Sequence, residues 1–254
     1  MSFWDHLEEL RGTIIRSALA VVIMSVAGLA FKDFLFDGII LRPTRPDFIV
    51  YRLLGWKFSM DLINVDISAQ FFVHLKAALG TGLVAAFPFI VWEIWKFVSP
   101  ALYDREVKPV RGAFLLSSVL FYCGVLVGYF FVLPVCLQFF MNYSVSDAVQ
   151  NSITLNSYMS MFISMVLLIG IVFEFPTVIA VLSRLGAVNR ALLRKGRKYA
   201  FVIILILSAI ITPSDPFSML VLAFPLYLLY EFSILLCAPE EKDDEEEPPT
   251  VQEN

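Results

Sequence analysis

The sequence predicts an all-α integral membrane protein with six transmembrane helices. Hydrophobic residues make up 59% of its 254 residues, whereas a soluble domain is typically about 45–50% apolar. These residues occur in long, almost uncharged runs, which is typical of helices that cross a bilayer. The excess apolar surface is therefore expected to face lipid.

The first two spans are expected at about 13–31 and 69–97. Only Arg16 interrupts the first run, near its start, and the run is too long for the apolar part of a cleavable signal peptide. Lys76 and Glu93 flank the uncharged part of the second run. We expect both side chains to extend toward the membrane surfaces, in opposite directions.

The next two spans are expected at about 112–135 and 155–183. Gly124 and Gly128 form a GxxxG pattern in the third span, which more often indicates close helix packing than a specific dimer. The fourth span contains a single charged residue, Glu174, in an otherwise apolar sequence.

The last two spans, about 199–212 and 216–235, are short. Their uncharged runs cover only about 21–23 Å of helix, against a hydrocarbon core of about 30 Å. We expect a helical hairpin that thins the local bilayer or lies against other protein.

Proline interrupts four of the spans. Each of these residues removes a backbone hydrogen-bond donor, so each is expected to kink its helix. Kinked helices do not pack as a straight bundle, and we therefore expect a curved, open, cupped arrangement. The four prolines are Pro88, Pro134, Pro176 and Pro225.

The distribution of Lys and Arg predicts the orientation. With the N-terminus in the cytoplasm, the inner segments hold thirteen of these residues and the outer segments six, all in or beside the first outer loop. Both termini are therefore expected in the cytoplasm. The first outer loop, about 32–68, is rich in aromatic residues and is expected to form an ordered cap with short helical pieces.

We divide the chain into a membrane domain, 1–238, and a tail, 239–254. The tail is strongly acidic, contains three prolines and has no aromatic residue, so it is expected to be disordered in the cytoplasm. Two isolated histidines and three widely spaced cysteines form no metal-binding pattern. We expect no metal, no cofactor and no nucleic-acid partner.

The opening stretch FWDHLEELR is amphipathic when it is placed on a helix. Its apolar face is expected to lie on the membrane, and its acidic face exposes Asp5, Glu8 and Glu9 at the inner surface. Two interpretations remain open from the residues alone. The acids either complement the N-terminus of a helix or form a site for a cationic ligand.

A second acidic candidate lies in the first inner loop, 97–112. Ser99 and Pro100 are expected to end the preceding helix, and Glu106 lies among three basic residues. Glu106 belongs either to a solvated salt-bridge cluster or to a carboxylate site for a cationic ligand.

Glu174 lies ten residues before Arg184, about 15 Å along a helix and hence near the middle of the membrane. An ionisable residue at this depth is by default functional. It could be a protonated group that holds a partner helix or a proton carrier. A proton-coupled transporter that uses Glu174 is the alternative function. An intramembrane enzyme would need a nucleophile and a base or metal, and the sequence shows no such companion.

In order along the chain, five stretches resemble the motifs of one family. They are FWDHLEELR, WEIWKFVSPALYDRE, FEFP, TPSDPFS and AFPLYLLYE. Together they resemble TatC, the multi-spanning subunit of the twin-arginine protein translocase, over about Phe3–Leu236. The six spans and the two cytoplasmic termini are similar to that family as well.

The resemblance implies a receptor and not an enzyme. The family recognises folded cargo proteins through a signal that bears two adjacent arginines, and matching positions imply that Glu9 and Glu106 meet them. Glu174 matches an intramembrane glutamate on the concave face. The other residues implied to shape the signal-binding site are Leu10, Arg11, Phe97, Pro100, Ala101, Leu102 and Tyr103.

The resemblance also implies partners and a location. TatA/TatB-like single-span proteins would dock near Thr212, Asp215, Met219 and Glu231, and several copies would assemble in the lipid bilayer of a bacterial cytoplasmic (inner) membrane. Transport would draw on the proton gradient. At Met219 many relatives carry a polar residue that helps bind a partner helix, and Met cannot donate that hydrogen bond.

Overall fold

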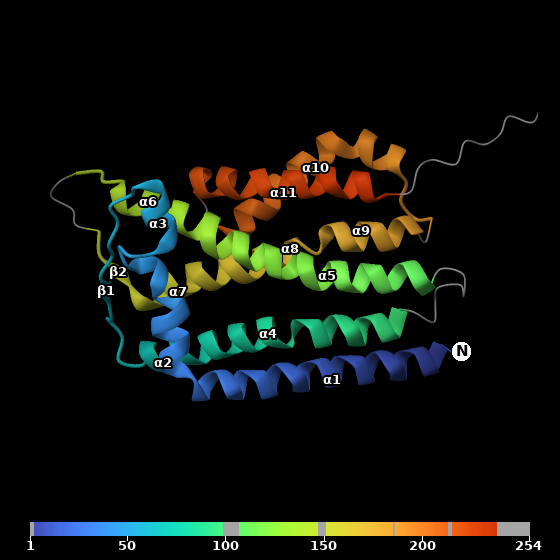
Figure 1. Cartoon of the computed structure of the whole chain (residues 1–254), viewed down its shortest axis with the longest axis horizontal. Coiled ribbons are helices and arrows are strands. Elements are labelled where there is room, and N and C mark those ends of the chain that lie inside the picture. The colour runs from blue at the N-terminus through green and yellow to red at the C-terminus, as the bar shows by residue number, and fades with distance from the viewer. Residues whose placement is uncertain (1–2, 99–106, 147–150, 185, 213–214, 238–254) are drawn as a thin grey trace, which may run out of the picture.

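The computed structural model describes residues 3–98, 107–146, 151–184, 186–212 and 215–237 (Figure 1). The fold is helical, and five helices within these residues are long and apolar enough to cross a membrane. They are His6–Ala30, Ala69–Val98, Leu115–Asn142, Leu155–Ser183 and Pro216–Leu236. The acidic tail that we expected to be disordered lies outside the described residues.

Helix α1 (Phe3–Ala30) is one continuous helix that packs along α4 (Ala69–Val98). The expectation that the opening stretch lies flat on the membrane is therefore wrong, because these residues form the first turns of α1 itself. Small residues bring the two helices close. Gly82 has no room for a side chain against Ser25, and Gly28 lies against Ala78.

The third span is longer than expected. Helix α5 (Val107–Val127) continues through a π-helical segment, η4 (Gly128–Val132), into α6 (Leu133–Asn142). The fourth span consists of α7 (Leu155–Ile163), the π-helical segment η5 (Ser164–Leu168), α8 (Ile169–Val172) and α9 (Phe175–Arg184).

The GxxxG glycines hold these two spans together, as the sequence predicts. A Cβ atom at Gly124 would lie 2.7 Å from the Cβ of Phe173 and 2.9 Å from the Cα of Gly170. At Gly128 it would lie 2.6 Å from the carbonyl oxygen of Met165. Because only glycine allows this approach, the backbones of α5 and α8 are in direct contact.

Two of the four prolines coincide with irregular backbone. Pro134 follows η4, and Pro176 follows a turn at Phe173 and Glu174 that separates α8 from α9. Pro88 and Pro225 lie inside helices that continue through them. The kinks that we expected in the helices therefore stay predictions.

Helices α10 (Arg190–Ile211) and α11 (Pro216–Leu236) form a hairpin. Each begins with a side-chain cap: Asn189 accepts a hydrogen bond from the backbone of Leu192, and Asp215 accepts one from that of Ser218. The apolar half of α10 coincides with the fifth expected span. The first turns of α10 are strongly basic, and α10 is not among the five described helices that are long and apolar enough to cross a membrane. The expected total of six crossings therefore stays a prediction.

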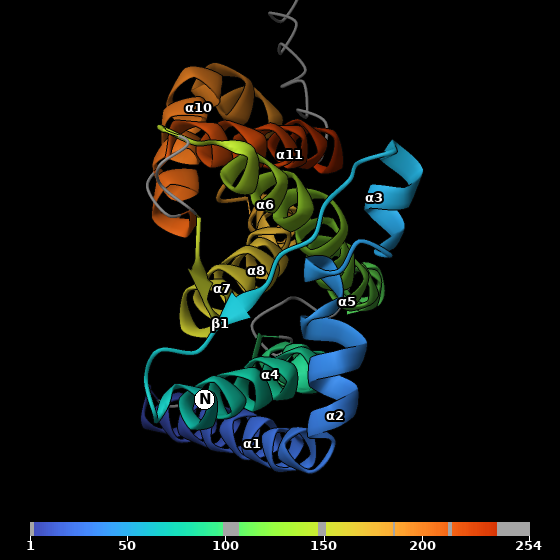
Figure 2. The same ribbon diagram turned by 90° about the vertical axis from the view of Figure 1, so that its left-hand side faces the viewer.

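The helices form a row, with α1 at one edge and α10 at the other (Figure 2). The N-terminus of α1 and the C-terminus of α11 lie at the same end of the row (Figure 1). We call this end the basic end, because the basic first turns of α10 lie there. The opposite end is called the loop end. This arrangement places the described ends of the chain on one side, as the orientation argument requires.

The first outer loop, at the loop end, contains short helical pieces, as the sequence predicts. These pieces are α2 (Lys32–Leu35), η1 (Phe36–Ile40), η2 (Arg42–Thr44) and α3 (Ile49–Leu54). Tyr51 anchors them, since its buried hydroxyl donates a 2.7 Å hydrogen bond to the carbonyl oxygen of Pro43. Burial raises the pKa of Tyr51 above its usual value. Two ion pairs, Arg42–Asp47 and Arg45–Asp37, add to the cap.

One pairing was not predicted. Strand β1 (Leu62–Ile63) pairs in parallel with β2 (Ile153–Thr154), so that Leu62 lies opposite Ile153. This pairing joins the first outer loop to the start of α7.

Candidate binding site at the basic end

Glu9 lies in the first turns of α1, on the side that faces the end of α4. The side chain is half-buried, and among the described residues its buried Oε2 atom has no hydrogen-bond partner. One turn earlier, the ring of His6 stacks on Phe97, with 4.3 Å between the ring centroids. The acidic start of α1 and the aromatic end of α4 therefore lie side by side.

The structure describes part of the signal-binding set that the sequence predicts. Leu10 is 37% exposed and Arg11 is exposed, and both follow Glu9 on α1. Phe97 is half-buried against His6. The remaining members lie outside the described residues: Pro100, Ala101, Leu102, Tyr103 and Glu106.

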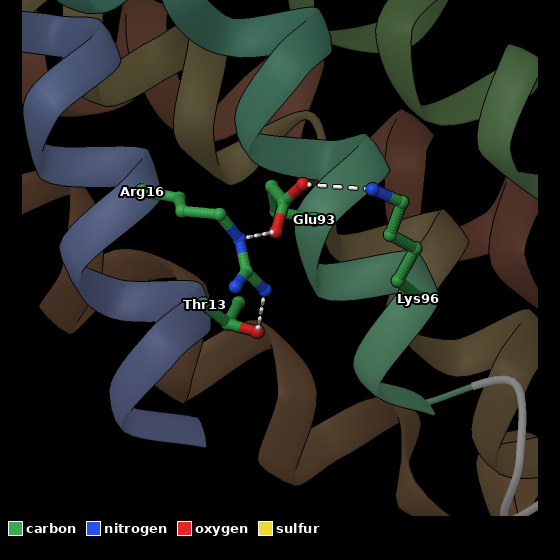
Figure 3. Close-up of polar contacts among 4 residues, drawn as sticks. All are labelled: Thr13, Arg16, Glu93 and Lys96. Atoms are coloured by element: carbon green, nitrogen blue, oxygen red, sulfur yellow. Dashed lines mark hydrogen bonds and ion pairs between the residues drawn. The ribbon is translucent and has the colours of Figure 1, made fainter. Parts of the chain in front are cut away.

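Beside this site is a charged cluster that sequence reasoning missed. Glu93 is only 1% exposed and lies between two cations (Figure 3). Arg16 Nε donates to its Oε2 at 2.5 Å, and Lys96 Nζ donates to its Oε1 at 3.1 Å. Arg16 also donates a longer bond, 3.4 Å, from Nη2 to the hydroxyl of Thr13.

The expectation that Glu93 extends toward the membrane surface is therefore wrong. A buried carboxylate is tolerated when cations and hydrogen bonds compensate its lost hydration. Arg16, the only charge in the first apolar run, supplies that compensation from the neighbouring helix. The spacing of Glu93 and Lys96, three residues apart on one helix, was the signal that could have found the cluster.

Glu174 faces a cavity of about 340 Å³ between α4, α5 and α9. Its Oε2 accepts a 2.6 Å hydrogen bond from Ser117, whereas its buried Oε1 has no partner among the described residues. Thr177 also reaches the cavity, and the rest of the lining is apolar. Within the described part of the chain, the cavity thus offers two unpartnered oxygens, Oε1 of Glu174 and Oγ1 of Thr177, inside an otherwise apolar lining.

The predicted partner-docking residues do not form one site. Thr212 and Asp215 lie at the loop end, where the hydroxyl of Thr212 donates to the carbonyl of Ser208 and Asp215 caps α11. Met219 is half-buried one turn further along α11. Glu231 lies at the basic end, about 24 Å from Asp215 along the helix.

At the basic end, Glu231 joins the two last helices. Its Oε2 lies 2.7 Å from Nη2 of Arg197 on α10. The hydroxyl of Tyr230 and the Nε atom of Arg190 add hydrogen bonds between the same helices. Among the described residues, no group of three or more His, Cys, Asp or Glu could hold a metal ion.

The family model described as "Sec-independent protein translocase protein (TatC)" matches residues 5–225. The chain belongs to the TatC family. The TatC of Blattabacterium sp. subsp. Periplaneta americana is 37% identical over 251 residues, covering 93% of this chain and 94% of that protein. The TatC of Desulforapulum autotrophicum is 36% identical over 248 residues, covering 96% and 88%.

Two solved TatC structures share the fold. One, described as "Crystal Structure of Twin Arginine Translocase Receptor- TatC", matches with a TM-score of 0.76 at 32% identity, covering 91% of this chain and 97% of that chain. A second, described as the same receptor in DDM, gives a TM-score of 0.79, also at 32% identity, covering 92% and 99%. As a TatC, the protein is a membrane-embedded subunit of the Sec-independent protein translocase and works within a membrane complex.

Proposed function

We propose that this TatC is the receptor that binds the twin-arginine signal of folded cargo proteins, and that Glu9 and Glu106 meet the two arginines. The observation that carries the proposal is the buried, unpartnered Oε2 atom of Glu9. A buried acceptor without a donor is costly, and a ligand that supplies donors recovers that cost.

The chemistry of the site favours arginine over lysine. A guanidinium presents planar pairs of donors that match a carboxylate, and it also stacks on aromatic rings. The stacked rings of His6 and Phe97 lie one turn from Glu9. A lysine ammonium neither forms the bidentate pair nor stacks in the same way.

The basic end is assigned to the cytoplasm by the positive-inside rule. The apolar part of a signal would then extend from Glu9 toward the cavity in front of Glu174. This cavity is lined by apolar side chains of α4 and α9, such as Ile94 and Val178. The unpartnered Oε1 atom of Glu174 would accept a hydrogen bond from a polar group on an incoming helix.

TatA/TatB-like single-span proteins are the proposed partners, and the proton gradient is the proposed energy source. The loop-end residues Thr212, Asp215 and Met219 would contact a partner helix. Glu231 would contact a partner at a separate place, at the basic end. The complex would contain several copies of this chain in the bacterial cytoplasmic membrane.

The transporter alternative needs a chain of ionisable groups at membrane depth. Among the described residues that line the cavity, Glu174 is the sole ionisable one. This apolar lining favours the binding of a helix over the conduction of protons.

The test is the binding of a labelled signal peptide to the purified protein in lipid nanodiscs. Wild type is expected to bind an Arg-Arg peptide more tightly than the matched Lys-Lys peptide, and Glu9→Gln is expected to lose most of the difference. Glu8→Gln is the matched control, because this neighbouring carboxylate is exposed. Equal affinities of wild type for the two peptides would contradict the proposal.

A further inference from the structure

We propose that Glu93 is a positioning residue that holds Arg16 away from Glu9 and thereby keeps Glu9 available to the incoming signal. The inference rests on the proposed role of Glu9. It gives the cluster of Arg16, Glu93 and Lys96 a part in recognition, because Glu93 keeps Arg16, a cation of the protein itself, from competing with the signal for Glu9.

Arg16 is placed to compete for Glu9. The two residues are seven apart on α1, so they share a face and lie about 10 Å apart along the axis. Side chains on a helix point toward its N-terminus, which directs the guanidinium of Arg16 toward Glu9.

The guanidinium of Arg16 lies closer to Glu9 than the Cα atom of Arg16 does. Its Nη1 atom lies 3.0 Å from the position that a Cβ atom would occupy at Gly12. Gly12 is one turn before Arg16 and three residues after Glu9. The absence of a side chain at Gly12 therefore allows the cation to lie back along α1, within about one turn of Glu9.

Glu93 directs this guanidinium sideways, to α4. Its carboxylate accepts a hydrogen bond from Nε of Arg16, and the hydroxyl of Thr13 accepts a longer one from Nη2. Glu93 itself is fixed, because it is buried to 1% exposure and Lys96 binds its second oxygen. Meanwhile the Oε2 atom of Glu9 has no partner among the described residues.

Without the charge at Glu93, the nearest carboxylate on the same face of α1 is Glu9. Arg16 stays charged, since arginine is not deprotonated in proteins, and its half-exposed side chain has room to turn toward another anion. A tethered guanidinium at Glu9 would compete directly with the arginines of the signal. A partly exposed ion pair of this kind is expected to weaken signal binding about fivefold.

The experiment compares Glu93→Gln, Arg16→Gln and the double variant, each as the full chain in lipid nanodiscs. The measured quantity is the affinity for a labelled Arg-Arg signal peptide, together with the thermal unfolding midpoint. We expect Glu93→Gln to bind about fivefold more weakly, and the double variant to return to within about twofold of wild type. Lys96→Gln is the matched control, since it removes the cation that binds the other oxygen of Glu93 and leaves the Arg16–Glu93 pair in place.

A purely structural role for the pair predicts a different pattern. Arg16→Gln and Glu93→Gln would then weaken binding alike, and the double variant would bind no better than either. That result would overturn the inference while leaving the proposed function intact. Equal affinity of wild type for the Arg-Arg and Lys-Lys peptides would instead contradict the proposed function itself.

If Glu93→Gln does not fold, the comparison moves to Glu93→Asp. This change keeps the charge and withdraws it by one methylene group, so it loosens Arg16 without burying an uncharged amide. A smaller loss of affinity that Arg16→Gln restores supports the inference. A loss that Arg16→Gln leaves unchanged contradicts it.

Discussion

Gly124 connects helix packing to the candidate site, and replacing it by alanine tests the packing directly. The new Cβ atom would lie 2.7 Å from both Cβ and Cγ of Phe173 and 2.9 Å from Cα of Gly170. Carbon atoms normally lie about 3.5–4.0 Å apart, so α8 must move about 1 Å from α5. Phe173 precedes Glu174 in the turn between α8 and α9, and the displacement therefore also strains the hydrogen bond from Ser117 to Glu174.

Two opposing terms set the magnitude of this effect. Overpacking of a filled contact costs about 1–3 kcal/mol. Alanine inside a helix recovers about 1 kcal/mol relative to glycine. The free energy of unfolding should therefore fall by up to about 2 kcal/mol, which lowers the midpoint of a chain of this size by up to about 8 °C.

The assay is thermal unfolding in detergent, with Gly196→Ala as the matched control. At Gly196 the nearest atom to a new Cβ is the hydroxyl of Tyr230 at 3.5 Å, an ordinary contact. This variant is expected to keep or raise the midpoint. A Gly124→Ala protein with a higher unfolding midpoint than wild type would show that α5 and α8 are not in close contact.

Two further predictions follow from single side chains. Glu174→Ala is expected to impair export of a twin-arginine cargo in cells while its amount in the membrane stays normal; normal export would reduce Glu174 to a packing residue. Asp215→Ala removes the cap of α11 and is expected to cost about 1 kcal/mol, or about 2–4 °C in the unfolding midpoint. Asp215→Asn keeps a capping oxygen and should lie near wild type, and equal losses in both variants would show that the charge of Asp215, rather than its cap, stabilises the helix.

The long helices could be predicted from the sequence because hydropathy is a local property. The run that ends at Phe97 and the run that starts at Leu155 coincide with structural helices within a residue or two. The close contact at Gly124 was also predictable, since small residues four apart indicate close packing. The start of α1 was misjudged because an amphipathic pattern does not distinguish a helix on the membrane from the first turns of a helix through it.

Features that join distant segments could not be predicted in the same way. Arg16 and Glu93 are 77 residues apart in sequence, and nothing local to either shows that α1 packs on α4. The pairing of Leu62 with Ile153 involves strands of two residues, too short for any periodic signal. For the candidate site, the sequence identified Glu9 and Phe97 but missed the cluster that lies behind them.

Four buried or half-buried glutamates differ in whether the fold itself supplies partners for their carboxylate oxygens. Glu93 and Glu231 each pair with an arginine on a neighbouring helix, so each has its partner within the fold. Glu9 and Glu174 each keep a buried oxygen without a partner in the described part of the chain. A buried unpaired acceptor lowers stability, and stability therefore does not explain these two residues. The proposed binding would account for them, because a guanidinium at Glu9 and a polar group at Glu174 would each supply the missing donor.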